Sequence, residues 1–288
     1  MLRLKDIDIV CSREQLKRIP DGKVLINTIN AHSYNVAQKD ERFANALKGG
    51  DYLIPDGASI VKACRWIQAK SRPTERIAGW DLFVMEMERL NGSRREVRGA
   101  RYEGAGYEGT REVFSTAKPS SHLAPRTSHP REASLPPRKN PVCLFMGSSE
   151  RVLSLIKEKA RTTYPNIAVK TYSPPYKAEF SNEDNRAIIE TINAANPDLL
   201  WIGMTAPKQE KWTYEHWNEL DIHCHVGTIG AVFDFFAGTA RRAPLWWQRH
   251  SLEWLYRLCQ EPRRMWRRYI IGNTLFLWNM TKELQVRN

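Results

Sequence analysis

The sequence contains no apolar run of the roughly 18 uninterrupted residues that a membrane-spanning helix needs. Its first residues, Met1–Asp8, mix charged and apolar side chains, so we expect no secretory signal. The five cysteines are scattered and form no C-x-x-C pair, which argues against a disulfide scaffold and indicates reduced thiols in a cytosolic protein. With 42% hydrophobic and 26% charged residues, the 288-residue chain has an ordinary globular composition and can bury a sizeable core.

Patterns of metal ligands are also scarce. The Asp-x-Asp spacing occurs only at Asp6 and Asp8, near the start of the chain. His223 and His225 would share one face of a strand, but no second cluster completes the four ligands that zinc prefers. We therefore expect neither a metal ion nor a cofactor.

The net charge of +12 is confined to two segments. Residues 92–140 contain ten basic and five acidic side chains, and residues 241–288 contain ten basic and three acidic ones. The first segment is rich in Gly, Ser, Pro and Arg and has no helical or strand periodicity, which predicts an exposed, disordered insertion. It includes a G-x-G-x-x-G string (Gly104, Gly106, Gly109), but no buried strand precedes it, so a dinucleotide site is not indicated.

The segment 241–288 interleaves basic residues with aromatic ones. It holds five of the ten tryptophans, namely Trp246, Trp247, Trp254, Trp266 and Trp278. Rings at headgroup level and cations on anionic lipid are typical of a membrane surface, so we predict a helical appendage that binds a membrane surface. A core-packing helix pair and a patch for single-stranded nucleic acid are the alternatives. Burial of this surface between copies of the chain also stays open, so a homo-oligomer is a further alternative.

Short apolar runs alternate with helical patterns along the chain. Strands are predicted at Val24–Asn27, Tyr52–Ile54, Val142–Met146, Ile167–Thr171, Leu199–Gly203 and Ile222–Val226. Helices are predicted at His32–Val36, Phe43–Leu47, Ser59–Gln68, Asp81–Leu90, Glu150–Thr163, Asn182–Ala195, Pro207–Leu220, Pro244–Gln260 and Arg263–Leu284. This alternation predicts an α/β fold with a mostly parallel sheet covered by helices. We divide the chain into an α/β core, residues 1–240, and the appendage, residues 241–288.

Several short strings follow one another in a fixed order. They are TIN at 28–30, PDG at 55–57, RIAGWD at 76–81, GMTAPKQE at 203–210, GTIGAVFDFFAG at 227–238, RAPLW at 242–246 and EWLYRLCQEPRR at 253–264. As an ordered set they resemble the WecG/TagA/CpsF family of bacterial glycosyltransferases. The insertion 92–140 departs from the family pattern.

The resemblance implies a Rossmann-like core and a C-terminal appendage. It also implies a metal-independent transfer of a hexose or N-acetylhexosamine from a UDP-sugar donor to a polyprenyl-diphosphate-linked saccharide. The acceptor is a lipid of the cytoplasmic leaflet, so the protein is expected at the inner face of the cytoplasmic membrane. Exopolysaccharide or cell-wall polymer synthesis would be its setting.

An inverting sugar transfer needs a base that removes the proton of the acceptor hydroxyl. Asp56 is the candidate because it follows an apolar strand in a Pro-Asp-Gly turn, and ligands of α/β sheets collect outside the carboxyl ends of strands. The alternative is a turn aspartate that bonds its own backbone. Thr28 and Asn30 end another strand and would bind the sugar or orient the base, with capping of the strand end as their alternative.

The other candidates bind substrate. Gln209 and Glu210 lie in the first turn of a helix opened by Pro207, where free N–H groups favour polar and anionic ligands. For Glu210 the alternative is a favourable charge at the helix dipole. Gly147 lies in a strand-to-helix turn that can present N–H groups to phosphate, although an ordinary serine-capped turn is the favoured explanation.

The diphosphate of the donor needs cations, and arginine binds phosphate with a planar fork. The candidates are Arg76, Arg241, Arg242, Arg257, Arg263 and Arg264. If the arginines of the tail reach the diphosphate, the appendage completes the active site. This is a hypothesis that couples catalysis to docking on the membrane.

A second class of function also stays open: a non-catalytic protein that binds nucleic acid or another anionic surface through its two basic segments. The charge-balanced core and its polar strand ends favour the enzyme, because a mere scaffold has no use for Asp56, Thr28 and Gln209 together. We therefore expect no nucleic-acid partner.

Overall fold

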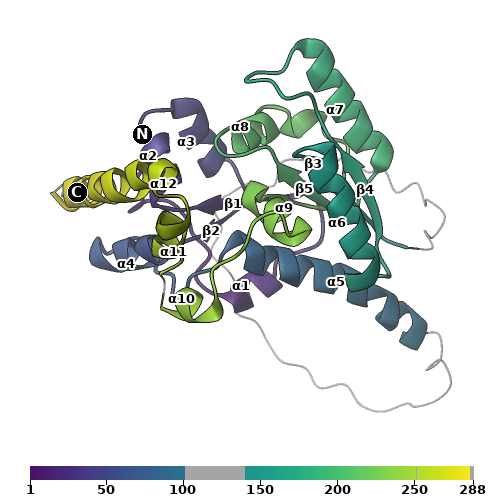
Figure 1. Ribbon diagram of the computed structural model, residues 1–288, viewed down its shortest axis with the longest axis horizontal. Helices are drawn as coiled ribbons and strands as arrows, with labels where there is room; N and C mark the ends of the chain where they lie inside the picture. Colours follow the sequence, from purple (N-terminus) through teal and green to yellow (C-terminus); the bar gives the residue numbers. More distant parts are fainter. Residues whose placement is uncertain (101–139, 251, 286–288) are drawn as a thin grey trace, which may run out of the picture.

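Six parallel strands form a central sheet in the computed structural model, which describes residues 1–100, 140–250 and 252–285 (Figure 1). The strands are β1 (Val24–Ile29), β2 (Tyr52–Pro55), β3 (Val142–Gly147), β4 (Ala168–Tyr172), β5 (Leu199–Gly203) and β6 (His225–Thr228). Their order across the sheet is β2-β1-β6-β5-β3-β4, and each of these pairings is parallel. The predicted Rossmann-like α/β architecture is confirmed.

Strands β3 and β5 are apolar throughout because helices cover both faces of the sheet. Phe145 and Trp201 pack on one face, whereas the next residues back along each strand, Leu144 and Leu200, pack on the other. This alternation follows the two-residue period of a strand. A strand buried on both faces therefore reads as a continuous apolar run.

Two groups of helices cover the two faces of the sheet. Phe145 and Trp201 share their core with α5 (Gly79–Ala100), α6 (Glu150–Thr163) and α9 (Gly230–Ala237). The opposite core includes residues of α7 (Asn182–Ala195) and α8 (Lys208–Glu215), which is followed by the 3-10 turn η1 (Trp217–Glu219). The remaining helices that precede β3 are α1 (Arg13–Lys17), α2 (Ala31–Ala37), α3 (Glu41–Lys48) and α4 (Ala58–Trp66).

The C-terminal segment contains α10 (Leu245–Arg249), α11 (Glu253–Gln260), α12 (Pro262–Trp266), the π-helical turn η2 (Arg267–Ile271) and α13 (Gly272–Gln285). Helix α13 packs on α2, where Phe276 meets Tyr34 edge-on with ring centroids 5.4 Å apart. The buried carboxylate of Glu283 accepts hydrogen bonds from the backbone N–H groups of Leu4 and Lys5, each at 3.0 Å, and from the Tyr34 hydroxyl. One face of the predicted appendage is therefore part of the hydrophobic core.

Some predicted boundaries are wrong for physical reasons. The helix predicted at Asp81–Leu90 extends to Ala100, so the first residues of the predicted insertion, 92–100, are helical. Residues 101–139, including the G-x-G-x-x-G string, lie outside the described part of the chain. The last strand begins at His225 rather than Ile222, because its pairing with β1 and β5 starts at His225; Ile222 and Cys224 are apolar residues that are buried without being part of the strand.

The predicted C-terminal helices are also subdivided. The helix expected at Pro244–Gln260 is two helices, since α10 ends at Arg249 and α11 begins at Glu253. The helix expected at Arg263–Leu284 contains the π-helical turn Arg267–Ile271. Within residues 1–100, 140–250 and 252–285, no helix combines the length and apolar character needed to cross a membrane.

The chain changes direction across the sheet between β3 and β5. From β3 it passes through α6 to β4, whereas from β5 it passes through α8 to β6 on the other side. Ligands of open α/β sheets bind outside the carboxyl ends of strands at such a switch point. Gly147 and Gly203 are register partners there, and a Cβ on Gly147 (φ +112°) would lie 2.4 Å from the Gly203 carbonyl oxygen. Glycine at 147 therefore lets the two loops approach closely.

Candidate active site

Asp56 directly follows β2 at the carboxyl edge of the sheet. Its backbone N–H donates to the Ile29 carbonyl at 2.8 Å, so the turn is fastened to the end of β1. Gly57 follows with φ +146°, a conformation that side-chain-bearing residues rarely adopt. The Pro-Asp-Gly turn therefore holds the half-buried residue Asp56 beside the adjacent strand end.

Asn30 lies at the end of β1 and has two roles in the structure. Its Oδ1 accepts from the backbone N–H groups of His32 and Ser33, each at 3.0 Å, which makes it the N-cap of α2. Its side chain also hydrogen-bonds Asp56. Asn30 thus caps the helix that follows the strand, and the same side chain places a donor at the acidic residue. Thr28, half-buried in β1, lies opposite Ile54 in the register.

The environment of Asp56 contains opposing influences on its charge. Burial raises the pKa of the Asp56 carboxyl above its usual value, while the nearby guanidinium groups of Arg76 and Arg257 lower that pKa. Glu253 raises the same pKa, and the hydrogen bond from Asn30 lowers it. The net result is a carboxylate with raised basicity, which is the property a general base near neutral pH requires.

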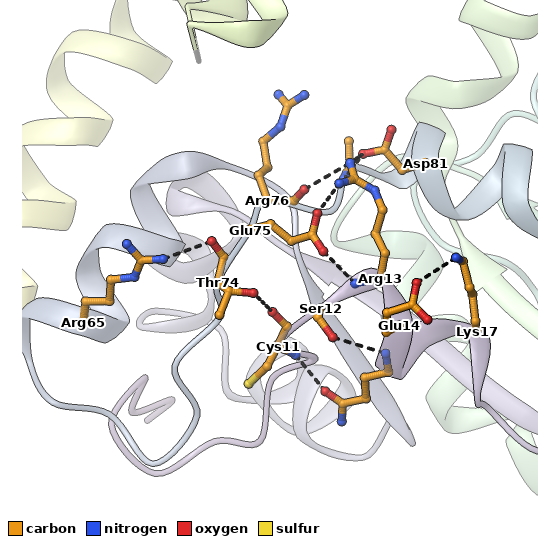
Figure 2. Close-up of polar contacts among 12 residues, drawn as sticks. Cys11, Ser12, Arg13, Glu14, Lys17, Arg65, Thr74, Glu75, Arg76 and Asp81 are labelled. Atoms are coloured by element: carbon orange, nitrogen blue, oxygen red, sulfur yellow. Dashed lines mark hydrogen bonds and ion pairs between the residues drawn. The ribbon is translucent and has the colours of Figure 1, made fainter.

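The loop that carries Arg76 is held by Arg13 of α1 (Figure 2). The Arg13 guanidinium binds the Glu75 carboxylate and donates to Asp81 Oδ2 at 3.0 Å, and its backbone N–H donates to Glu75 Oε1 at 2.9 Å. Asp81 Oδ2 also accepts from the Ala78 N–H at 3.0 Å. In Figure 2 the Arg76 side chain points away from this cluster, so the contacts fix its backbone and leave its guanidinium group to other partners.

The C-terminal segment supplies those partners. The carboxylate of Glu253, in α11, forms an ion pair with Arg76 and lies 3.4 Å from Arg242 Nε. Arg242 stacks on Trp80, 5.5 Å from its ring centre, and Arg257 stacks on Phe235 at 4.9 Å. Arg76 and Arg257 therefore lie near Asp56, and Arg242 is joined to Arg76 through Glu253. Exposed Arg241 and Arg263 join none of these described contacts, and the side chain of Arg264 in α12 lies outside the described part.

Gln209 and Glu210 lie in the first turn of α8, as predicted, although Pro207 is the N-cap and not the first helical residue. Both side chains are buried, with exposed fractions of 4% and 1%. Gln209 Nε2 donates to Glu210 Oε1 at 2.9 Å. Burial raises the pKa of Glu210 to about 7, against the lowering effect of this hydrogen bond. Glu210 is therefore not an exposed charge that only complements the helix dipole.

A chain of contacts connects the Asp56 turn with Gln209. The Ile77 N–H donates to the Pro55 carbonyl at 3.1 Å. Gly79 packs against Ile229, since an added Cβ would lie 3.3 Å from its Cγ2. The next residue, Gly230, faces Gln209 Oε1. The strings RIAGWD, GTIGAVFDFFAG and PKQE thus meet at one edge of the sheet, between the two groups of candidate residues.

Gly147 lies at the same edge, at the end of β3. Ser149 caps α6 by accepting from the Val152 N–H at 3.4 Å, so the serine-capped turn expected as the favoured explanation is present. Binding of phosphate by this turn stays a prediction.

Arg13 and Glu253 hold the site together, and the sequence did not identify either role. Glu253 is part of the EWLYRL string, yet its partner Arg76 is 177 residues away. Arg13 belongs to no motif, and Asp81 is 68 residues away. Their roles depend on tertiary contacts that local spacing does not encode.

Among the described residues, no group of three or more His, Cys, Asp or Glu side chains forms a candidate metal site. Asp6 and Asp8, the Asp-x-Asp pair, form separate ion pairs with Arg3 at 3.1 Å and Lys70 at 2.9 Å. His225 is bonded to Glu86 at 3.1 Å and to the Pro20 carbonyl at 3.0 Å.

The fold and this edge define an α/β protein of the Rossmann-like class, with a carboxylate and nearby arginines at the carboxyl edge of the sheet, the edge at which such proteins bind ligands. The model of the Glycosyl transferase WecG/TagA/CpsF family matches residues 4–103 and 130–288. The chain therefore belongs to this family of glycosyltransferases.

Two relatives are similar over most of the chain. A Bacillus subtilis (strain 168) protein, 26% identical over 256 residues, is named N-acetylglucosaminyldiphosphoundecaprenol N-acetyl-β-D-mannosaminyltransferase; the match covers 88% of this chain and 78% of the relative. A protein of the same name from Bacillus spizizenii (strain ATCC 23059 / NRRL B-14472 / W23) is 25% identical over 235 residues, covering 81% and 70%.

Proposed function

We propose that this protein transfers N-acetylmannosamine or a related hexose from a UDP-sugar to a polyprenyl-diphosphate-linked saccharide, with inversion at the anomeric carbon. The names of its relatives support the sugar and the lipid-linked acceptor. The observation that carries the proposal is the environment of Asp56, a carboxylate with a raised pKa beside Asn30, Arg76 and Arg257. Synthesis of a cell-wall polymer or exopolysaccharide is the proposed setting.

In this mechanism Asp56 accepts the proton of the attacking acceptor hydroxyl. The acceptor oxygen forms a bond to the anomeric carbon, and the bond from that carbon to UDP breaks with its electron pair leaving on the diphosphate. Arg76, Arg242 and Arg257 neutralise this departing charge. Thr28 and Asn30 orient the base and the sugar, and Gln209 binds the sugar. No metal ion is assigned to the reaction.

We also propose peripheral attachment to the inner face of the cytoplasmic membrane. Twelve large hydrophobic side chains are exposed among the described residues, and eight of them follow residue 244. These eight are Trp246, Trp254, Trp266, Ile270, Ile271, Leu277, Trp278 and Leu284. Exposed rings and aliphatic side chains on a segment with ten basic and three acidic residues favour a lipid surface with anionic headgroups.

The test is a panel of UDP-sugars with a synthetic lipid-diphosphate acceptor that carries N-acetylglucosamine. We expect one donor to be preferred and the product to have the anomeric configuration opposite to that of the donor. Asp56→Asn keeps the shape but removes the base, so it should lower kcat about 10²- to 10⁴-fold. Transfer at an unchanged rate by Asp56→Asn would contradict the assignment, and absence of transfer from every donor would contradict the proposed function.

A further inference from the structure

Two adjacent buried side chains at the start of α8 have unsatisfied oxygen atoms. Gln209 Nε2 donates to Glu210 Oε1 at 2.9 Å, while Gln209 Oε1 and Glu210 Oε2 have no hydrogen-bond partner in the structure. The two residues are only 4% and 1% exposed. Because a buried polar atom without a partner is costly, the unpaired amide oxygen indicates a place where a ligand supplies the missing donor.

The contact with Glu210 determines which way the amide of Gln209 faces. When Glu210 is ionised, its Oε1 atom can only accept a hydrogen bond, so it pairs with the NH₂ end of the amide, since the carbonyl end has no hydrogen to donate. The carbonyl end must then point to the other side. It faces Gly230, the first residue of α9, where an added Cβ would lie 2.9 Å from Gln209 Oε1 and 3.1 Å from the Thr205 backbone nitrogen.

We propose that Glu210 is a positioning residue that does not touch substrate and instead holds the Gln209 carbonyl oxygen toward Gly230 at the carboxyl edge of the sheet. This inference rests on the proposed function, because the donor group that pairs with the carbonyl is a hydroxyl or acetamido N–H of the transferred sugar. A phosphate oxygen does not suit this position, since it would meet another hydrogen-bond acceptor. This arrangement requires glycine at 230, because a side chain there would collide with the amide of Gln209.

A double-mutant cycle on the sugar transfer tests whether Glu210 acts through Gln209. In Glu210→Gln the new amide can donate to Gln209 Oε1, so the orientation of Gln209 is no longer fixed. We expect the KM for the UDP-sugar to rise about 5- to 10-fold with little change in kcat, the loss of roughly one hydrogen bond. In the Gln209→Ala background the same substitution should change KM less than about twofold. Equal effects in both backgrounds would overturn the proposal.

A glycine substitution gives a matched control. Gly230→Ala places a methyl group against Gln209 Oε1 and should raise KM as Glu210→Gln does, whereas Gly92→Ala, with nothing within 4 Å of the added Cβ, should not. Thermal unfolding of each variant shows whether it is folded. An unchanged KM in folded Gly230→Ala would show that the position of the Gln209 carbonyl oxygen does not depend on the missing side chain at 230, and would argue against the proposal.

A second readout does not depend on activity. The hydrogen bond from Gln209 lowers the pKa of Glu210, so the carboxyl pKa measured by ¹³C NMR should rise in Gln209→Ala. An unchanged pKa would show that the contact does not form, and would refute the positioning role. If the wild-type protein transfers no sugar while this pKa responds, the proposed function fails and the contact stands.

Discussion

The pH dependence of the reaction should move in opposite directions when single charges of α11 are removed. Arg257 lowers the pKa of Asp56 and Glu253 raises it. A general base works only when ionised, so a higher pKa moves the acidic limb of the kcat/KM profile to higher pH. Arg257→Gln should therefore shift this limb upward. Glu253→Gln should shift it downward, both by removing a negative charge and by releasing Arg76 from its ion pair.

The size of the shift follows from the neighbours that remain. An opposite charge close to a carboxylate typically lowers its pKa by about 1–3 units. Arg76 is the larger of the two arginine influences and stays in place in Arg257→Gln, so we expect about 1 unit, equivalent to roughly 1.4 kcal/mol. At the pH where the wild-type protein retains half its maximal kcat/KM, the variant would retain only about a tenth of its own maximum.

The assay is initial-rate transfer between about pH 4.5 and 8.5, analysed by the position of the limb and not by its height, because Arg257 is also a candidate phosphate ligand. Arg267→Gln is the matched control, since this exposed arginine of the same segment stacks on Trp266 at 5.4 Å. It should leave the limb in place. Coincident limbs for all three variants and the wild type would refute the electrostatic link between α11 and Asp56.

Three further predictions concern the loop that carries Arg76, the docking of α13 and the binding of lipid. Arg13→Gln removes the contacts to Glu75 and Asp81 that fix the Arg76 loop, so kcat/KM should fall about tenfold with both kcat and KM affected in steady-state assays; unchanged kinetics would contradict the positioning of Arg76. Glu283→Ala leaves the donors of Leu4, Lys5 and Tyr34 without their acceptor and should destabilise the fold by about 3 kcal/mol, lowering Tm in calorimetry by roughly 6–10 °C; a Tm within 1–2 °C of wild type would show that the docking of α13 does not depend on this carboxylate. Replacing exposed Trp266 and Trp278 by serine should weaken sedimentation with anionic vesicles about tenfold while transfer to a water-soluble acceptor is retained; equal sedimentation would count against lipid binding by this surface.

The sheet and most helices could be predicted because their patterns are local. Val142–Gly147 and Leu199–Gly203 are apolar at every position and short, and these two properties together indicate strands that are buried on both faces. Parallel strands also place their carboxyl ends at one edge, so the alignment of Asp56 with Asn30 follows from the alternation of strands and helices.

The order of the strands could not be obtained in this way. Strand β6 is last in the sequence but lies between β1 and β5, where Thr228 Oγ1 donates to Asn27 Oδ1 at 2.8 Å. The position of β6 between β1 and β5 places Gly230 next to Gln209 and completes the chain of contacts to Asp56. Such pairing depends on the fit of distant side chains, and no period in the sequence contains that information.

The C-terminal segment has one face that packs on the core and one face that is exposed. The contacts of its acidic residues agree with this division. The segment has only three acidic residues, Glu253, Glu261 and Glu283. Glu253 forms an ion pair with Arg76 of the core, and Glu283 binds the N-terminal backbone and Tyr34, so at least two of the three are used to fasten the segment to the core. The excess of positive charge is then left to the rest of the segment, together with exposed rings such as Trp266 and Trp278. A segment fastened this way keeps Arg257 near Asp56, and any membrane contact through its outer face would hold the proposed catalytic edge of the sheet close to the lipid.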